Sequence, residues 1–288
     1  MDNKKQMFGK VVQLSGHGTS TGIWPRFFLQ MIELAPFAIG KNEFDKNQVY
    51  FDNVMPQITK LYDIYHKFKE VLDDYREGIQ SGKYYIINDR GQITHDKIPE
   101  VEIFNLARDF FINGKIMLVN FAKSGVIDDN TFKLEDFYFS DEKKFEIKKQ
   151  EYLQTSDGRY LALINLLEKA QNDFLRPFNK IRGDIEHSHF KINDFKLEET
   201  QHGAFILEPI FDDRNLSLSL QFFYENILDV IEKLIVYFLG KNMEYKKGSA
   251  ISLYVRHEYN YPNMLYKYTI AIGGNVLLGT PADKCSYS

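Results

Sequence analysis

A short segment between Phe178 and Ile192, F-N-K-I-R-G-D-I-E-H-S-H-F-K-I, carries an arginine and two histidines close together. Four residues separate Arg182 from His187, and His189 follows two positions later. A histidine titrates near neutral pH, so it can accept or donate a proton during a reaction. An arginine is planar and always charged, so it can hold phosphate oxygens and stabilise the negative charge that grows on them. The segment therefore has the residue types for acid–base chemistry on a phosphate ester.

The same segment has the period of an amphipathic helix. Phe178, Ile181 and Ile185 are three or four positions apart and form one apolar stripe that must face a core. Arg182 and His187 are then about 140° apart around the helix, flanking the outward side. One helix alone does not aim both side chains at a single point. Two copies related by a two-fold axis could place the arginine of one chain beside the histidine of the other.

The Arg182-x4-His187 pattern, followed by a short Phe-Lys-Ile run, resembles the signature of the HEPN superfamily. Its position agrees too, because the pattern lies toward the end of a predicted helix with one long helix still to come. The resemblance implies a four-helix bundle that acts as a homodimer and cleaves RNA without a metal, with Arg182 and His187 as catalytic residues. It also implies a bacterial toxin or anti-phage defence role, with a cognate antitoxin or regulatory protein as a further partner.

Single-stranded RNA is the expected substrate, because the ribose 2′-hydroxyl would attack the adjacent phosphate and DNA lacks that hydroxyl. Nearby cations are expected to bind the RNA backbone: Lys180, Arg176 and Lys191. Other polar residues of the segment are further candidates for the site: His189, Glu186 and Asp184.

Two features leave a second interpretation open. Gly183 follows the arginine, where active members of the superfamily usually carry a polar residue, although its bare backbone would let another backbone or a phosphate approach closely. Arg182 and Glu186 are four apart, which also fits an ion pair on a helix surface. The alternative is a non-catalytic HEPN-like scaffold or partner-binding module.

A second pair, Arg90 and His95, has the same spacing. It lies around the turn sequence N-D-R-G, between strand-like pieces at Tyr84 to Ile87 and Gln92 to His95, which predicts a β-hairpin. A hairpin turn explains these two residues, so we expect them to be dispensable for catalysis.

Composition and motifs exclude several other classes of function. The 36 Lys and Arg against 40 Asp and Glu give a net charge of -4, which argues against a protein that is basic throughout. The single cysteine, Cys285, allows no intramolecular disulfide and no cysteine-based zinc site. The His, Asp and Glu residues lack metal-binding spacings, and the Gly-rich stretch 15–22 lacks the Lys-Ser/Thr ending of a phosphate-binding loop. We therefore expect no metal and no cofactor.

The N-terminus has no apolar run of the signal-peptide type, and charges interrupt every long apolar stretch. These features predict a cytoplasmic protein without a membrane partner.

The apolar period predicts helices over about 54–80, 99–123, 156–189 and 216–239. Pro177 predicts a kink in the third helix, with a separate segment from there to about His189. Alternation from 190 to 197 and an apolar run from 204 to 210 indicate strands, and 249–257 with 265–272 indicate a C-terminal hairpin.

The predicted fold is therefore mostly α, a four-helix bundle with β-hairpin insertions and a C-terminal β-hairpin. We expect three regions along the chain. Residues 1–46 would form an irregular N-terminal arm, 47–245 the helical bundle with its insertions, and 246–288 the C-terminal elaboration.

Overall fold

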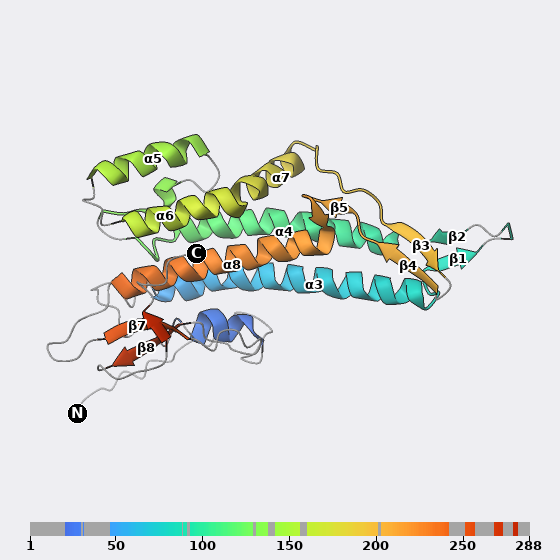
Figure 1. Cartoon of the computed structure of the whole chain (residues 1–288), viewed down its shortest axis with the longest axis horizontal. Helices are drawn as coiled ribbons and strands as arrows, with labels where there is room; N and C mark the ends of the chain where they lie inside the picture. Colours follow the sequence, from blue (N-terminus) through green and yellow to red (C-terminus); the bar gives the residue numbers. More distant parts are fainter. Residues whose placement is uncertain are drawn as a thin grey trace, which may run out of the picture.

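The computed structural model describes residues 21–29, 31, 47–87, 89–90, 93–128, 131–137, 142–155, 160–200, 203–241, 251–256, 268–272 and 279–281. Over these residues the chain is mostly helical, with small antiparallel sheets between and after the helices (Figure 1). Within this described part, no helix is both long enough and apolar enough to cross a membrane.

Three helices of 26 residues each run along the long axis of the molecule (Figure 1): α3 (Met55–Gln80), α4 (Ile98–Lys123) and α8 (Leu216–Lys241). Each is about 39 Å long at 1.5 Å per residue. The three pack against one another, and their facing side chains form the core of the protein. The helices predicted over 54–80 and 99–123 are confirmed to within a residue. The fourth continues past its predicted stop at Leu239 and ends at Lys241.

The third predicted helix consists of three consecutive pieces. They are α6 (Leu161–Ala170), the π-helix η5 (Gln171–Leu175) and α7 (Arg176–Glu186). Pro177 lies in the first turn of α7, a position where a helix tolerates the missing N–H of proline. The irregular turn is therefore the π-helix directly before the proline, and the separate segment ends at Glu186 rather than near His189. Residues 156–159, where we expected the helix to start, lie outside the described residues.

The connection between α4 and α6 contains two helices that the sequence did not predict. They are the 3-10 helix η4 (Leu134–Phe137) and α5 (Glu142–Thr155). Phe145 of α5 is buried against Phe137, with ring centroids 5.7 Å apart. Lys149 also forms an ion pair with Glu168 of α6. The first contact holds α5 against η4, and the second holds it against α6 of the third helical segment (Figure 1).

Short antiparallel pairs make up the β structure. Three of them are two-stranded: β1 (Tyr85–Ile87) with β2 (Ile93–His95), β3 (Lys196–Thr200) with β4 (Gly203–Leu207), and β5 (Ile210–Phe211) with β6 (Arg214–Asn215). The fourth sheet has three strands, β7 (Ile251–Arg256) between β8 (Tyr268–Ile272) and β9 (Gly279–Pro281). The predicted hairpins at N-D-R-G and at the C-terminus are confirmed. The strand expected over 190–197 is wrong for 190–195, because regular pairing begins at Lys196.

Part of the expected N-terminal arm is helical and buried. The π-helix η1 (Trp24–Leu29) places Phe27 in the core at 3% exposure. Arg26 donates hydrogen bonds from Nε and Nη2 to Oε2 of the buried Glu232 on α8, at 3.0 and 2.8 Å. A further π-helix, η3 (Tyr50–Val54), leads directly into α3.

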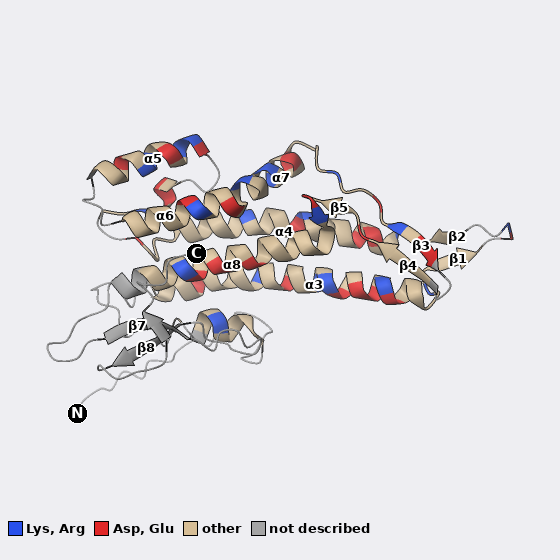
Figure 2. Cartoon of the chain, viewed as in Figure 1, with Lys and Arg blue, Asp and Glu red and all other residues tan. Residues whose placement is uncertain are grey.

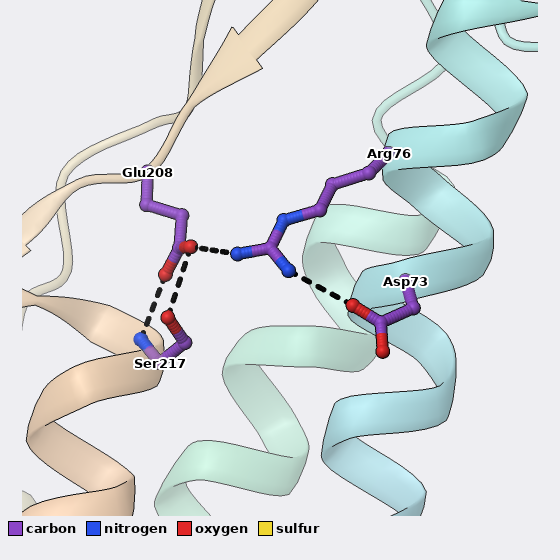
Figure 3. A network of polar contacts seen from close by, with 4 residues as sticks. All are labelled: Asp73, Arg76, Glu208 and Ser217. Carbon is purple, nitrogen blue, oxygen red and sulfur yellow. Dashed lines mark hydrogen bonds and ion pairs between the residues drawn. The ribbon is translucent and has the colours of Figure 1, made fainter.

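A polar network fixes the start of α8 against α3 (Figure 3). Glu208 is 6% exposed and accepts hydrogen bonds from the Ser217 backbone N–H at 2.7 Å and from its hydroxyl at 2.9 Å. Arg76 of α3 pairs with the same carboxylate and with Asp73, the latter at 2.8 Å. A carboxylate at a helix N-terminus satisfies unpaired N–H groups and favours the helix dipole. The network therefore caps α8 and links its start to the last part of α3.

Candidate functional site

The apolar stripe of α7 fixes the orientation of the motif helix. Phe178, Ile181 and Ile185 are buried, as the sequence predicted. Phe178 packs against Phe111 of α4 and Phe223 of α8, with ring centroids 5.4 and 5.7 Å apart. Arg182 lies beside this stripe on the helix and is partly exposed.

Arg182 forms an ion pair with Glu186 through Nη1. Its side chain is 31% exposed, and its Nε atom is buried without a hydrogen-bond partner. In the described part of the chain, no hydrogen bond or ion pair joins Arg182 to His187 or to His189. A single copy of the chain thus does not bring the motif arginine and the motif histidines together, as the helix geometry predicted.

The two histidines lie in the turn that ends α7. The Ser188 N–H donates to the Ile185 carbonyl at 3.4 Å, and the His189 N–H donates to the Asp184 carbonyl at 2.7 Å. Ser188 has a φ of 61°, in the left-handed region. These bonds are those of a Schellman motif, which usually has glycine at this position. The turn leaves His187 and His189 exposed on either side of a strained residue.

A buried lysine lies under the motif helix. Lys115 of α4 is 7% exposed, and its Nζ donates a hydrogen bond to Oδ1 of Asn179 on α7 at 2.8 Å. Burial, with a smaller contribution from the charge of Arg182, lowers the pKa of Lys115 to about 8. No carboxylate pairs with Lys115 among the described residues. Two cations therefore lie close together at the contact between α4 and α7, and only one of them has a carboxylate partner.

The cations expected to bind an RNA backbone have different surroundings. Lys180 and Lys191 are exposed. Arg176 is also exposed but forms an ion pair with Glu142 of α5 at 2.8 Å. Figure 2 shows Lys and Arg positions interspersed with Asp and Glu on α7 and along the trace that leads from α7 to β3.

That trace forms one wall of a groove of about 720 Å³, and the first half of α4 forms the other. We call it the 190–196 groove. It is lined by residues from these two segments: Phe104, Asn105 and Arg108 on α4, and residues 190–196.

The histidine of the second Arg-x4-His pair has a structural role. His95 is 15% exposed in its side chain, and its Nε2 lies 2.7 Å from Oε1 of Glu100. Glu100 is 2% exposed and also accepts a hydrogen bond from the Tyr75 hydroxyl at 2.7 Å. His95 thus helps to satisfy a buried carboxylate at the start of α4.

The described residues contain no group of three or more His, Cys, Asp or Glu side chains that could hold a metal ion.

Sequence reasoning missed Lys115 and most of the 190–196 groove. Lys115 falls on the apolar stripe of its helix, four positions after Phe111 and three before Leu118. A lysine on such a stripe indicates a buried cation, so the sequence did contain a signal for this residue. The groove had no local signal, because Arg108 and Lys191 are far apart in the chain. Comparisons of the chain with protein-family models, with curated proteins and with solved structures gave no match.

Proposed function

We propose that the protein is a metal-independent endoribonuclease of the toxin or anti-phage defence type, which cleaves single-stranded RNA as a homodimer. The proposal includes a HEPN-like four-helix bundle formed by α3, α4, the α6–α7 segment and α8. The motif lies at the end of the third of these segments, with α8 still to follow, and this order supports the resemblance seen in the sequence.

The observation that carries the proposal is the positive charge of Lys115 and Arg182 at the contact between α4 and α7, the helix that ends in two exposed histidines. A buried cation without a carboxylate partner is unfavourable by itself and favours a bound anion nearby. The phosphate of a nucleic-acid backbone is such an anion.

The nucleophile of the reaction would be the 2′-hydroxyl of the RNA substrate itself. His187 accepts the proton of the 2′-hydroxyl, the 2′-oxygen attacks phosphorus, and the bond from phosphorus to the 5′-oxygen breaks. The leaving 5′-oxygen takes a proton from a second histidine, His189 of the copy that supplies Arg182. Arg182 stabilises the charge on the phosphate oxygens. The products are a 2′,3′-cyclic phosphate and a 5′-hydroxyl.

A homodimer is part of the proposal because Arg182 and His187 do not meet within one chain. Gly183 supports close approach of a second copy, since a Cβ atom at this position would have no neighbour within 4 Å. The exposed turn at Ser188 would then place histidines from both copies along one cleft.

Incubation of the purified protein with single-stranded RNA in EDTA tests the proposal. We expect cleavage of the RNA with 2′,3′-cyclic phosphate ends, and no cleavage of DNA of the same sequence. His187→Ala should reduce the rate by about 10²-fold or more, and Arg182→Ala by a similar factor. Full cleavage by the Arg182→Ala/His187→Ala double variant would contradict the assignment of these residues.

The ion pair between Arg182 and Glu186 favours the second candidate function, a non-catalytic scaffold or partner-binding module. In that case the arginine only forms an ion pair on the helix surface. An ion pair of this exposure contributes about 0.3–0.5 kcal/mol to the free energy of unfolding. The scaffold predicts no cleavage of any RNA and unchanged partner binding by the double variant.

A further inference from the structure

The 190–196 groove begins directly where the motif ends. Its volume is about 720 Å³, and Phe190, the first residue of its loop wall, follows His189 in the chain. The Phe190 backbone N–H donates to the Asp184 carbonyl at 2.9 Å, and its ring packs against Phe211 with centroids 5.6 Å apart. This wall of the groove is therefore fixed to the end of α7.

The groove is basic. Arg108, Lys191 and Lys196 are exposed, and none of the three has an ion-pair partner among the described residues. Asp194 is the only carboxylate among the residues that line the groove, and Lys97 binds it at 2.7 Å. The lysine lowers the pKa of Asp194 by hydrogen bonding. The groove thus offers three cations against one carboxylate that is already neutralised.

An aromatic ring forms part of the other wall. Phe104 is partly exposed, and one of its faces stacks on Phe195, with centroids 5.8 Å apart and planes 21° apart. Phe195 is 3% exposed and is held in turn by an edge contact with Tyr75, with centroids 5.6 Å apart. Among the described residues, Phe104 has no second ring partner. Phe195 thus holds the Phe104 ring in place, and the ring lines the same groove as the three cations.

We propose that the 190–196 groove binds single-stranded RNA, with a base stacked on Phe104 and the phosphates on Arg108, Lys191 and Lys196. Cations that follow a backbone beside an aromatic ring are the usual means of binding a single strand without sequence preference. The amides of Asn105 and Asn193 add hydrogen-bonding groups to the same groove.

The inference deepens the proposed endoribonuclease and rests on it for the identity of the ligand. Consecutive Cα atoms are 3.8 Å apart, so Lys191 lies within about 8 Å of His189 along the chain. A strand held in the groove would therefore enter the motif region next to the exposed histidines.

Fluorescence anisotropy with a labelled 2′-O-methyl RNA 12-mer tests this binding. The probe has no free 2′-hydroxyl, so binding is measured without cleavage. The groove variant is Arg108→Gln/Lys196→Gln. Its matched control is Lys60→Gln/Lys123→Gln, which removes the same charge from exposed positions on α3 and α4 outside the groove. Phe104→Leu keeps an apolar side chain on Phe195 but removes the ring, and circular dichroism checks that each variant is folded.

We expect the groove variant to lower the slope of log affinity against log salt by about 1.4, for two lost phosphate contacts at about 0.7 each. Phe104→Leu should weaken binding about tenfold at every salt concentration, because base stacking on an aromatic ring has this strength. The Lys60→Gln/Lys123→Gln control should bind the probe like the wild type.

Equal loss of affinity in the groove variant and its control would overturn the inference, and so would unchanged binding by Phe104→Leu. Displacement of the probe by poly-glutamate at equal charge concentration would show that the groove binds any polyanion, and this result would also overturn the inference. Failure of this inference is distinguishable from failure of the proposed function. Cleavage of ordinary RNA with normal KM by the groove variant would contradict only the groove proposal. Binding of the probe without any cleavage of RNA would contradict only the proposed endoribonuclease activity.

Discussion

Lys115 Nζ on α4 donates a hydrogen bond to Asn179 Oδ1 on α7 at 2.8 Å, under the helix that carries Arg182. Burial, and then the neighbouring arginine charge, lower the pKa of this lysine to about 8 from an ordinary value of 10.5. The lysine is therefore a buried link between two helices, and its pKa is lowered by that burial.

The stability of the protein should therefore rise between about pH 8 and pH 10. Over this range the folded protein releases the Lys115 proton while the unfolded chain keeps it, so the free energy of unfolding increases, by about 2 kcal/mol. Above about pH 10 the trend should reverse, because the unfolded chain ionises tyrosines whose pKa is raised by burial in the folded protein, such as Tyr65. Urea unfolding across this pH range measures the effect.

Lys115→Met is the control, since methionine is unbranched and fills a similar space without a charge. The variant should be more stable than the wild type at pH 7 and should lack the rise between pH 8 and pH 10. Parallel pH profiles for the two proteins would show that Lys115 is not the group responsible.

Two glycines near the candidate site should respond in opposite ways to alanine. At Gly114 a Cβ atom would lie 2.9 Å from Phe178 Cζ, so the packing of α4 against α7 must shift. Gly114→Ala should lower the free energy of unfolding by about 1–2 kcal/mol, the packing strain less the gain in helix propensity. At Gly183 the added methyl meets nothing within 4 Å, so Gly183→Ala should raise stability by about 0.5–1 kcal/mol.

Activity separates structural from functional effects at these two positions. If a second copy or a phosphate approaches Gly183, Gly183→Ala should reduce RNA cleavage although it stabilises the fold. A Gly183→Ala protein that is more stable and fully active would show that no close approach occurs there.

His95→Ala should reduce stability and leave catalysis unchanged. The substitution removes one partner of the buried Glu100 carboxylate, which keeps its hydrogen bond from Tyr75. A loss of about 1–3 kcal/mol is expected when a buried charged group loses a hydrogen bond. Thermal unfolding and cleavage per folded molecule measure the two effects. Loss of cleavage in a well-folded His95→Ala protein would identify the second Arg-x4-His pair as the catalytic one.

The long helices could be predicted because their signals are local. Over 54–80 and 99–123 the apolar residues repeat every three or four positions, and Gly82 and Gly125 follow the ends. Both glycines have a positive φ, 79° and 70°, a conformation that favours glycine after a helix. The orientation of α7 followed for the same reason, from the apolar stripe at Phe178, Ile181 and Ile185.

The remaining features depend on contacts between distant parts of the chain. Helix α5 has few apolar residues of its own, and Phe145 becomes a core residue only through Phe137 and its neighbours. The N-terminal π-helix depends on the ion pair of Arg26 with Glu232, 206 positions away. The 190–196 groove likewise combines α4 with a loop beyond α7, so no sequence window contained it.

The most direct test of the central claim, a composite site of Arg182 from one copy and His187 from another, is subunit complementation. Arg182→Ala and His187→Ala proteins are purified separately, mixed in equal amounts under conditions that allow exchange, and assayed for RNA cleavage in EDTA. Half of the dimers formed are mixed and each restores one of two sites, so the mixture should recover about a quarter of wild-type activity, while each variant alone stays inactive. An active wild type whose mixed variants remain as inactive as the separate ones would contradict the composite site.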